Sequence, residues 1–250
     1  MLDRYGPGAR VAVFGASGGI GAAFVRALAE DDQVAEVFAF SRRAVPSAGK
    51  VTGLVCDPLD EGALGDAAAA MKAGGPMHVV VSAIGTLHGP LPSRDKGYGP
   101  EKAFRQLDPE AFGQVMAVNA LAPALVAKHT APLLAKDRPA ALALLSARVG
   151  SISDNGLGGW HSYRASKAAL NMLIRGLSIE VARRAEQAIV VGLHPGTVDT
   201  ALSEPFQRGV PDGKLFTPER SVAGMLGTLN GLRPDDTGWV FDYAGERVPA

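Results

Sequence analysis

Seven short apolar segments, separated by longer amphipathic stretches, limit the fold of this 250-residue chain more than any other feature. Runs such as VVVSAI and IVVGL are apolar throughout, which is typical of strands covered on both faces by helices. Strands of this kind, each followed by a helical stretch, predict an α/β fold with a parallel sheet between two helical layers. The expected strands are residues 10–15, 34–41, 51–56, 77–84, 140–146, 188–194 and 238–241.

The stretches between the strands have helical periodicity and helix-start signals. Asp108 precedes Pro109 and Thr217 precedes Pro218, so each helix has a capping oxygen before a proline at its first position. The helix expected at 160–186 is apolar around most of its circumference, so we expect one side to face another subunit in a homodimer or homotetramer. Since no linker-like segment interrupts the chain, we expect one domain over residues 1–250. The expected helices are residues 19–31, 60–73, 108–135, 160–186 and 217–230.

Two segments, 85–107 and 195–216, lack either pattern. Loops of this length in a compact domain are usually functional. Both follow expected strands at their carboxyl ends, where ligands bind in open α/β sheets. We therefore expect these segments to form the substrate loops.

A glycine-rich turn, GASGGIG, follows the first expected strand and opens the first helix. Glycine tolerates positive φ and lets the backbone approach a pyrophosphate, whose charge the N–H groups at the helix N-terminus receive. A plain glycine-rich turn is the alternative, but the strand–turn–helix context favours dinucleotide binding. The expected contacts are Gly15, Ser17, Gly19, Ile20 and Gly21.

The end of the second expected strand reads Ser41-Arg42-Arg43. An acid here would accept hydrogen bonds from the free ribose 2′-hydroxyl of NAD, whereas arginine holds a 2′-phosphate. The pair therefore favours NADP(H), the alternative being two solvated arginines at a strand end. Gly18 argues the other way, since a basic residue at that position would strengthen the case for NADP(H).

Tyr163 and Lys167 lie four residues apart in the helix expected at 160–186. That spacing places phenol and ammonium on one helical face. A nearby cation favours tyrosinate, so we expect Lys167 to lower the pKa of Tyr163 and make the phenol an acid or base near neutral pH.

Together these motifs resemble the short-chain dehydrogenase/reductase family over essentially the whole chain. The resemblance implies a single-domain Rossmann fold with a seven-stranded, mostly parallel sheet and helices on both faces. It also implies that Tyr163 protonates the substrate oxygen, Ser146 orients that oxygen, Lys167 also holds the nicotinamide ribose, and Asn119 holds a water for proton supply. The further cofactor contacts that it implies are Asp57, Ser82, Ala83, Gly85, Pro195, Gly196, Val198 and Thr200.

The chain departs from the family pattern at two places. Ser82 stands where the family's turn has asparagine, and Ser146 and Tyr163 are 17 residues apart instead of the usual 12 to 14. The extra residues fall in SISDNGLGGWHS. This segment, with SYRASKAALN, resembles the C-factor and sniffer-like carbonyl reductase subgroup.

Composition excludes several other classes of function. With 25 basic and 25 acidic residues the chain has no net charge for holding nucleic acid or an anionic membrane. The N-terminus has no apolar signal core, and no run approaches the length of a spanning helix, so we expect a cytoplasmic protein without a membrane segment. One cysteine and five scattered histidines do not form a metal-ligand pattern, so we expect no metal.

Five further residues have weaker claims to a role. His161 and His194 more commonly pack than react without a carboxylate neighbour, and Cys56 lies in an apolar strand, where inert thiols are usual. Trp160 and Phe206 line either a substrate pocket or the core.

We expect an NADP(H)-dependent oxidoreductase that transfers a hydride between nicotinamide and a small, partly apolar carbonyl or alcohol substrate. The alternative is an NADP(H)-binding signalling or sensor protein with little turnover. A methyltransferase on a similar sheet would explain the glycines but not the Tyr163–Lys167 pair.

Overall fold

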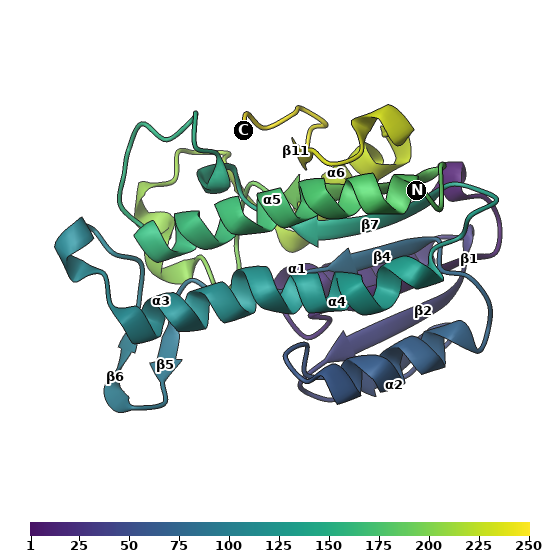
Figure 1. Cartoon of the computed structure of the whole chain (residues 1–250), viewed down its shortest axis with the longest axis horizontal. Coiled ribbons are helices and arrows are strands. Elements are labelled where there is room, and N and C mark those ends of the chain that lie inside the picture. The colour runs from purple at the N-terminus through teal and green to yellow at the C-terminus, as the bar shows by residue number, and fades with distance from the viewer.

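The computed structural model describes the backbone of all 250 residues and the side chains of all except residues 94 and 96. A seven-stranded sheet in the order β11-β8-β7-β4-β1-β2-β3 forms the centre, and all its neighbouring strands are parallel (Figure 1). This arrangement confirms the predicted α/β fold and all seven strands. They are β1 (Ala9–Phe14), β2 (Val34–Ser41), β3 (Val51–Val55), β4 (Val79–Ser82), β7 (Ala140–Leu145), β8 (Ala188–His194) and β11 (Val240–Asp242).

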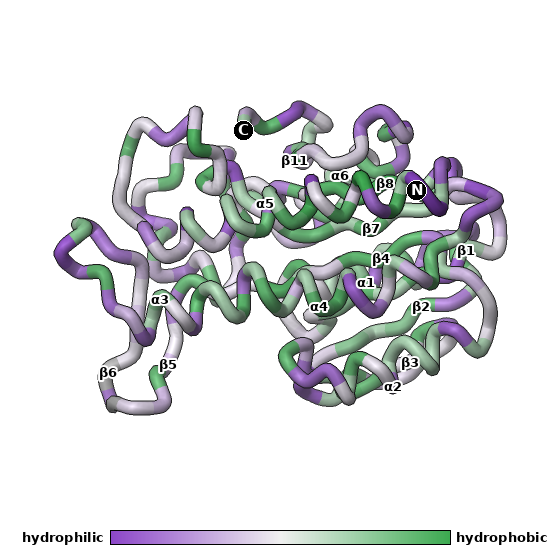
Figure 2. The backbone as a smooth tube through the Cα atoms, in the orientation of Figure 1, coloured by the Kyte–Doolittle hydropathy of each residue, from purple (hydrophilic) through white to green (hydrophobic). Residues whose placement is uncertain are grey.

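Helices cover both faces of the sheet, as the sequence predicts. Successive residues of β1 point to opposite faces, so Val13 packs with α1 (Gly19–Glu30) and α6 (Pro218–Gly231). Phe14 packs instead with α2 (Glu61–Lys72), α4 (Ala122–Thr130) and α5 (His161–Ala182). Burial on two faces is the reason why the strand segments are continuously apolar, and Figure 2 shows this along β4 and β7.

The helical segment expected at 108–135 is one rod in Figure 1 but has a local change of pitch. It comprises α3 (Pro109–Met116), a π-helical turn (Ala117–Leu121), α4 and a 3-10 turn (Ala131–Leu133). By length and composition alone this rod could cross a membrane. However, Val126 and Ala127 pack in the protein core against the sheet, and a buried core helix has the same composition.

Both segments without a predicted pattern contain short regular elements. Residues 85–107 include a hairpin of β5 (Gly89–Leu91) and β6 (Arg94–Tyr98). Residues 195–216 include β9 (Thr197–Val198), which pairs with β10 (Leu215–Phe216), and a 3-10 segment (Glu204–Gly209). These strands are too short to show a periodicity, so their pairing is invisible in the sequence. The hairpin extends past the ends of the sheet to which the arrowheads of β4 and β7 point, where segment 85–107 is expected (Figure 1).

Candidate functional site

The glycine-rich turn joins β1 to α1 in a conformation that only glycine fits. Gly15 has φ +85°, and a Cβ there would lie 2.8 Å from the carbonyl oxygen of Ala83. A Cβ on Gly21 would lie 2.1 Å from the carbonyl oxygen of Gly15. The residue before α1, Gly18, provides no side-chain cap, so the first N–H groups of this helix face outward as an anion site. Ile20 packs against the core beside this turn.

The residues predicted to meet the adenosine ribose come together at the ends of β1, β2 and β3. The hydroxyl of Ser41 donates to Ser17 Oγ at 2.5 Å and accepts the backbone N–H of Arg43 at 3.2 Å. Arg42 and Arg43 are exposed, as a pair that receives a phosphate from solvent must be. Asp57 is also exposed, one residue after Cys56, whose N–H donates to the carbonyl oxygen of Ser41.

The turn after β4 lies between the glycine-rich turn and the predicted catalytic residues. Ser82 is fully buried, and its hydroxyl has no hydrogen-bond partner within the part of the chain that the structure describes. A Cβ on Gly85 would lie 3.6 Å from Asn119 Oδ1 and 3.8 Å from Lys167 Nζ. The segment from Ser82 to Gly85 therefore connects the two halves of the site.

Asn119 is buried in the π-helical turn and holds the chain that follows β4. Its Oδ1 accepts the N–H of Thr86 at 2.7 Å, and its Nδ2 donates to the Thr86 carbonyl at 2.8 Å and to Ser166 Oγ at 3.1 Å. Tyr98 extends this network through a 2.7 Å hydrogen bond between its hydroxyl and Thr86 Oγ1. The widened turn presents Asn119 inward, a common use of π turns at functional sites.

Lys167 lies one turn after Tyr163 on α5 and is 2% exposed. Its Nζ donates to the carbonyl oxygen of Leu145, the last residue of β7, at 2.9 Å and lies 5.8 Å from the centroid of the Tyr163 ring. Burial lowers the pKa of Lys167 to about 8. Burial also raises the pKa of Tyr163 to about 12, so the expected lowering is wrong. The cause is the loss of hydration, which disfavours the charged phenolate.

Ser146 follows β7 directly and is 3% exposed. Its backbone N–H donates to the carbonyl of Leu193 on β8 at 2.8 Å, which fixes the residue at the end of the sheet. Its hydroxyl donates to Oδ1 of Asn171 on α5 at 2.6 Å. Two contacts from α5, by Lys167 and Asn171, therefore hold the end of β7 at consecutive residues.

The segment after β8 covers the glycine-rich turn from the opposite side. Gly196 has φ +76°, and a Cβ there would lie 2.9 Å from the ring of Phe216. The Pro195 carbonyl accepts a hydrogen bond from Ser221 of α6 at 2.7 Å. A Cβ on Gly19 would lie 2.7 Å from the methyl carbon of Thr200, so the loop and the glycine-rich turn touch. Val198, in β9, is buried beneath this contact.

Aromatic side chains gather beside Tyr163. The Trp160 ring lies edge-on to Tyr163 at 6.2 Å and to Phe206 at 5.4 Å, measured between centroids, and His88 lies 5.9 Å from Phe206. Trp160 has φ 52°, the one non-glycine residue with positive φ in the described backbone. Such strain persists only where surrounding contacts hold it, and it is frequent at functional sites. Trp160 therefore lies between Tyr163 and Phe206 in one aromatic cluster.

The other weaker candidates are two histidines and a cysteine. The His161 ring packs edge-on against Phe104 at 5.2 Å. His194 is half-buried, and burial lowers its pKa to about 4. Burial raises the pKa of the Cys56 thiol to about 11, which makes it unreactive at neutral pH. Among the side chains that the structure describes, no cluster of three metal-ligating residues is present.

Two contacts in the site were missed by the sequence analysis. Glu101, buried in the segment 85–107, accepts hydrogen bonds from the N–H and hydroxyl of Ser162, directly before Tyr163. No local pattern marks this long-range contact. Asn171, in contrast, continues the four-residue spacing from Tyr163 through Lys167, a signal that was available in the sequence.

Comparison with known proteins gives consistent results. Residues 9–210 match the family model described as short chain dehydrogenase. The C-signal protein of Myxococcus xanthus is 38% identical over 147 residues, which cover 59% of this chain and 83% of that protein. Both results support the resemblance that the sequence motifs indicated, including that to the C-factor subgroup.

Two solved structures share the fold over 98% of this chain. The NADPH-bound carbonyl reductase from chicken fatty liver has a TM-score of 0.82 and 25% identity over 95% of its chain. Carbonyl reductase Sniffer of D. melanogaster has the same TM-score with 20% identity over 100% of its chain, which shows the shared fold. By sequence and by fold, the chain therefore belongs to the short-chain dehydrogenase family of nicotinamide-dependent oxidoreductases.

Proposed function

We propose that this protein is an NADP(H)-dependent reductase of small carbonyl compounds that also runs in the alcohol-oxidising direction. The main support is the attachment of α5 to the end of β7. Lys167 on α5 binds the carbonyl of Leu145 at 2.9 Å, so the helix that carries Tyr163 is fixed beside Ser146. The same constellation reaches the glycine-rich turn through Gly85, next to both Asn119 and Lys167.

The proposed roles follow from the protonation states. A pKa of about 12 keeps the Tyr163 phenol protonated at neutral pH, as a proton donor to a carbonyl oxygen must be. Lys167, with a pKa of about 8, is mostly an ammonium at pH 7 and stabilises the phenolate as the proton leaves. Ser146 hydrogen-bonds the substrate oxygen. The bound nicotinamide supplies the hydride. Asn119 orients the segment at Thr86 and, we expect, a water that returns a proton to Lys167.

The residues present fit a dinucleotide. The uncapped N-terminus of α1 and the glycine-rich turn suit the pyrophosphate, and the unpartnered hydroxyl of Ser82 is a buried polar group available to a ligand. Asp57 suits the adenine, and the segment Pro195–Thr200 suits the nicotinamide end. We propose that Ser17, Ser41, Arg42 and Arg43 together bind a 2′-phosphate. The chicken carbonyl reductase with bound NADPH, which shares this fold, supports the same choice.

The catalytic proposal is tested by Tyr163→Phe. The variant should fold and bind NADPH, yet lose at least about 100-fold in turnover, the usual scale of a general acid. Aldehydes, ketones and diketones are screened for NADPH oxidation with both proteins. Tyr5→Phe is the matched control, because the Tyr5 hydroxyl donates to the Leu229 carbonyl of α6, within the core. Near wild-type turnover by Tyr163→Phe would remove this tyrosine from the mechanism.

Cofactor preference is tested by titrating tryptophan fluorescence with NADPH and NADH. One charge-assisted contact is worth about 1.5 to 3 kcal/mol, so NADPH should bind about tenfold to a hundredfold more tightly. Arg42→Asp should abolish or invert this difference, whereas Arg233→Asp, with the same change of charge on an exposed residue after α6, should leave it intact. Equal binding of the two nucleotides by the wild type would contradict the assignment of the arginines.

The sensor alternative has one specific observation in its favour, the 38% identity to the C-signal protein. A sensor would bind NADPH but would reduce no carbonyl compound in the panel. Wild-type turnover that depends on Tyr163 would exclude a purely non-catalytic role.

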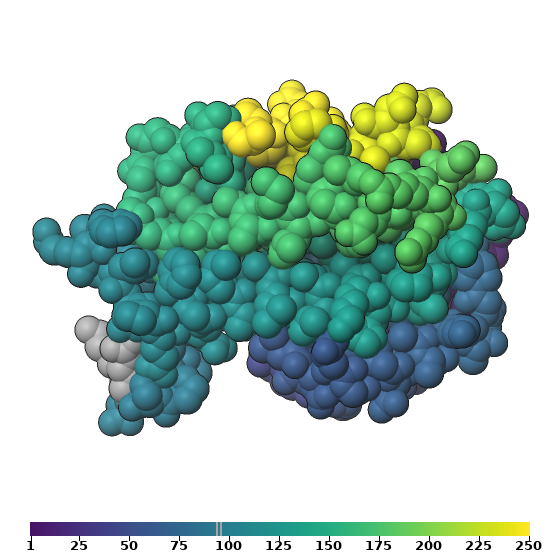
Figure 3. All heavy atoms as spheres, in the orientation of Figure 1, coloured from purple at the N-terminus to yellow at the C-terminus, as the bar shows by residue number. Residues whose placement is uncertain are grey.

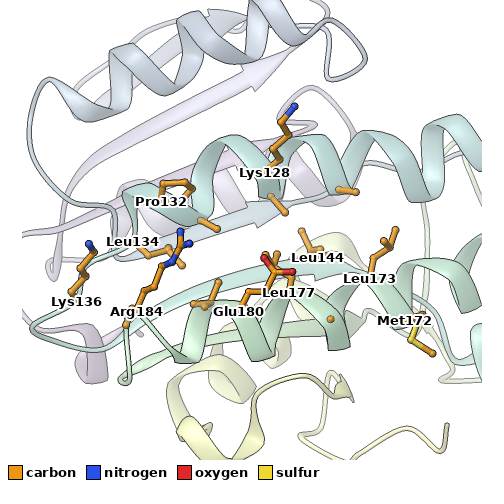
Figure 4. A pocket seen from close by; sticks show the side chains of 16 residues that line it. Lys128, Pro132, Leu134, Lys136, Leu144, Met172, Leu173, Leu177, Glu180 and Arg184 are labelled. Atoms are coloured by element: carbon orange, nitrogen blue, oxygen red, sulfur yellow. The ribbon is translucent and has the colours of Figure 1, made fainter.

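We propose that a second copy of the chain covers a groove of about 610 Å³ between α4 and α5 (Figures 3 and 4). Met172 is 71% exposed at its edge, and Leu173 and Leu177 line it. Glu180, together with Lys136 and Arg184, gives the groove both signs of charge, which a symmetric contact can pair with itself. Light scattering should give a dimer or tetramer for the wild type and a smaller particle for Met172→Glu. A wild-type monomer would refute this proposal.

A cytoplasmic location and a single domain remain predictions.

A further inference from the structure

Asn171 is the direct partner of the Ser146 hydroxyl, and no motif assigns it a role. Ser146 Oγ lies 2.6 Å from Asn171 Oδ1. Four residues correspond to about 6 Å along a helix, so Tyr163, Lys167 and Asn171 lie one above another on the face of α5 that meets β7. Each of the last two contacts a different residue at the end of β7, namely Leu145 and Ser146.

This contact poses a problem for catalysis. A serine hydroxyl has a single proton, and Ser146 donates it to Asn171 Oδ1. A carbonyl oxygen needs that same proton from Ser146. If Asn171 were an acceptor only, every substrate would have to break this partly buried hydrogen bond and leave Asn171 Oδ1 without its donor, at a cost in free energy.

Asn171 and the substrate both need the one Ser146 proton, but a primary amide can also donate, because it has an acceptor and a donor at the same end. We propose that Asn171 is a positioning residue that accepts from Ser146 in the free protein and donates to Ser146 Oγ once the substrate takes the serine proton. The amide turns about its terminal bond, and Ser146 Oγ keeps a partner in both states. A donor to Oγ also polarises the hydroxyl and strengthens its bond to the carbonyl. This inference rests on the proposed carbonyl reduction.

Two substitutions separate positioning from packing. Asn171→Asp has the same shape but, as a carboxylate, only accepts, so it retains the Ser146 proton. We expect a loss of about 100-fold in kcat, the scale for removal of one oxyanion donor. Asn171→Leu leaves the serine proton free and should lose only about tenfold. NADPH affinity, followed by fluorescence, should remain within about twofold in both variants, because Asn171 hydrogen-bonds Ser146, a predicted substrate contact and not a cofactor contact.

The test is which of the two variants, Asn171→Asp or Asn171→Leu, has the lower kcat. If Asn171 only packs, the isosteric Asn171→Asp should lose less kcat than Asn171→Leu. A kcat of Asn171→Asp at or above that of Asn171→Leu would therefore overturn the proposal. Asn230→Asp on α6 is the control for added charge, since Asn230 Oδ1 accepts the N–H of Arg4 and an aspartate oxygen accepts it equally. It should keep wild-type kcat.

A second measurement needs no substrate and therefore separates this inference from the proposed function. Ser146→Ala and Asn171→Leu each remove the same hydrogen bond, so the loss of Tm in the double variant should be smaller than the sum of the single losses. Additive losses would refute the contact even if a carbonyl substrate is found. Failure of every carbonyl with a non-additive cycle would instead refute the proposed function and leave the Ser146–Asn171 contact standing.

Discussion

Lys167→Met replaces a buried ammonium by an apolar side chain of similar length. Lys167 is 2% exposed, and burial lowers its pKa from 10.5 to about 8. Since one pKa unit corresponds to 1.36 kcal/mol, keeping the side chain charged at pH 7 costs the folded protein about 3 kcal/mol. Lys167→Met removes this cost, but it also removes the hydrogen bond to the Leu145 carbonyl, which is worth about 1.5 to 3 kcal/mol. We therefore expect Lys167→Met to be as stable as the wild type or up to about 2 kcal/mol more stable at pH 7.

The pH dependence gives a sharper test than stability at one pH. Between pH 8 and 10.5 the unfolded chain, with a lysine pKa near 10.5, binds more protons at this residue than the folded protein does. The contribution of Lys167 to the free energy of unfolding of the wild type therefore rises with pH through this interval, by about 2 kcal/mol between pH 8 and 9.5. The methionine variant lacks this contribution. All other titrating groups are common to both proteins, so they cancel in the difference.

The assay is urea unfolding of both proteins at pH 8 and pH 9.5, with NADPH titration and turnover measured in parallel. The stability advantage of Lys167→Met should shrink by about 2 kcal/mol between the two pH values. Turnover and NADPH affinity should both fall, since the ammonium is proposed to stabilise the Tyr163 phenolate and hold the ribose. If the stability difference is the same at both pH values, Lys167 does not have a lowered pKa and the argument fails.

Three further variants test contacts around the candidate site and the cap of α6. Gly21→Ala should lose NADPH binding in fluorescence titration and lower Tm, because its Cβ would lie 2.1 Å from the Gly15 carbonyl oxygen; binding as tight as wild type would refute the turn geometry. Glu101→Ala should destabilise the fold by about 1 to 3 kcal/mol in urea and lower kcat, because Ser162 beside Tyr163 loses a buried acceptor; an unchanged Tm would contradict that contact. Thr217→Ala should cost about 1 kcal/mol with no change in kcat, since Thr217 Oγ1 caps α6 by accepting the N–H of Arg220 at 3.2 Å; a kcat effect would show coupling of α6 to the site.

The sequence by itself determined the strands, the long helices and most of the predicted site. Continuous apolar runs identify strands buried on two faces, and this signal is local to each run. The glycine-rich turn and the Tyr163–Lys167 pair are also local, because seven consecutive residues or one helical turn contain the whole pattern. Because the carboxyl ends of parallel strands share one edge of a sheet, the sequence also places Ser41, Ser82 and Ser146 at that edge.

Only the tertiary structure decided which hydrogen bonds and protonation states the site has. The bond between Ser146 and Asn171 joins residues 25 apart, and the one between Asn119 and Thr86 joins residues 33 apart. Such pairs depend on how α5 and the π-helical turn pack, which no local pattern encodes. The pKa of Tyr163 is the clearest case, since four-residue spacing predicts a lowering whereas burial raises it. Spacing along a helix determines which side chains are neighbours, but hydration, which sets their charge, is determined by everything packed around them.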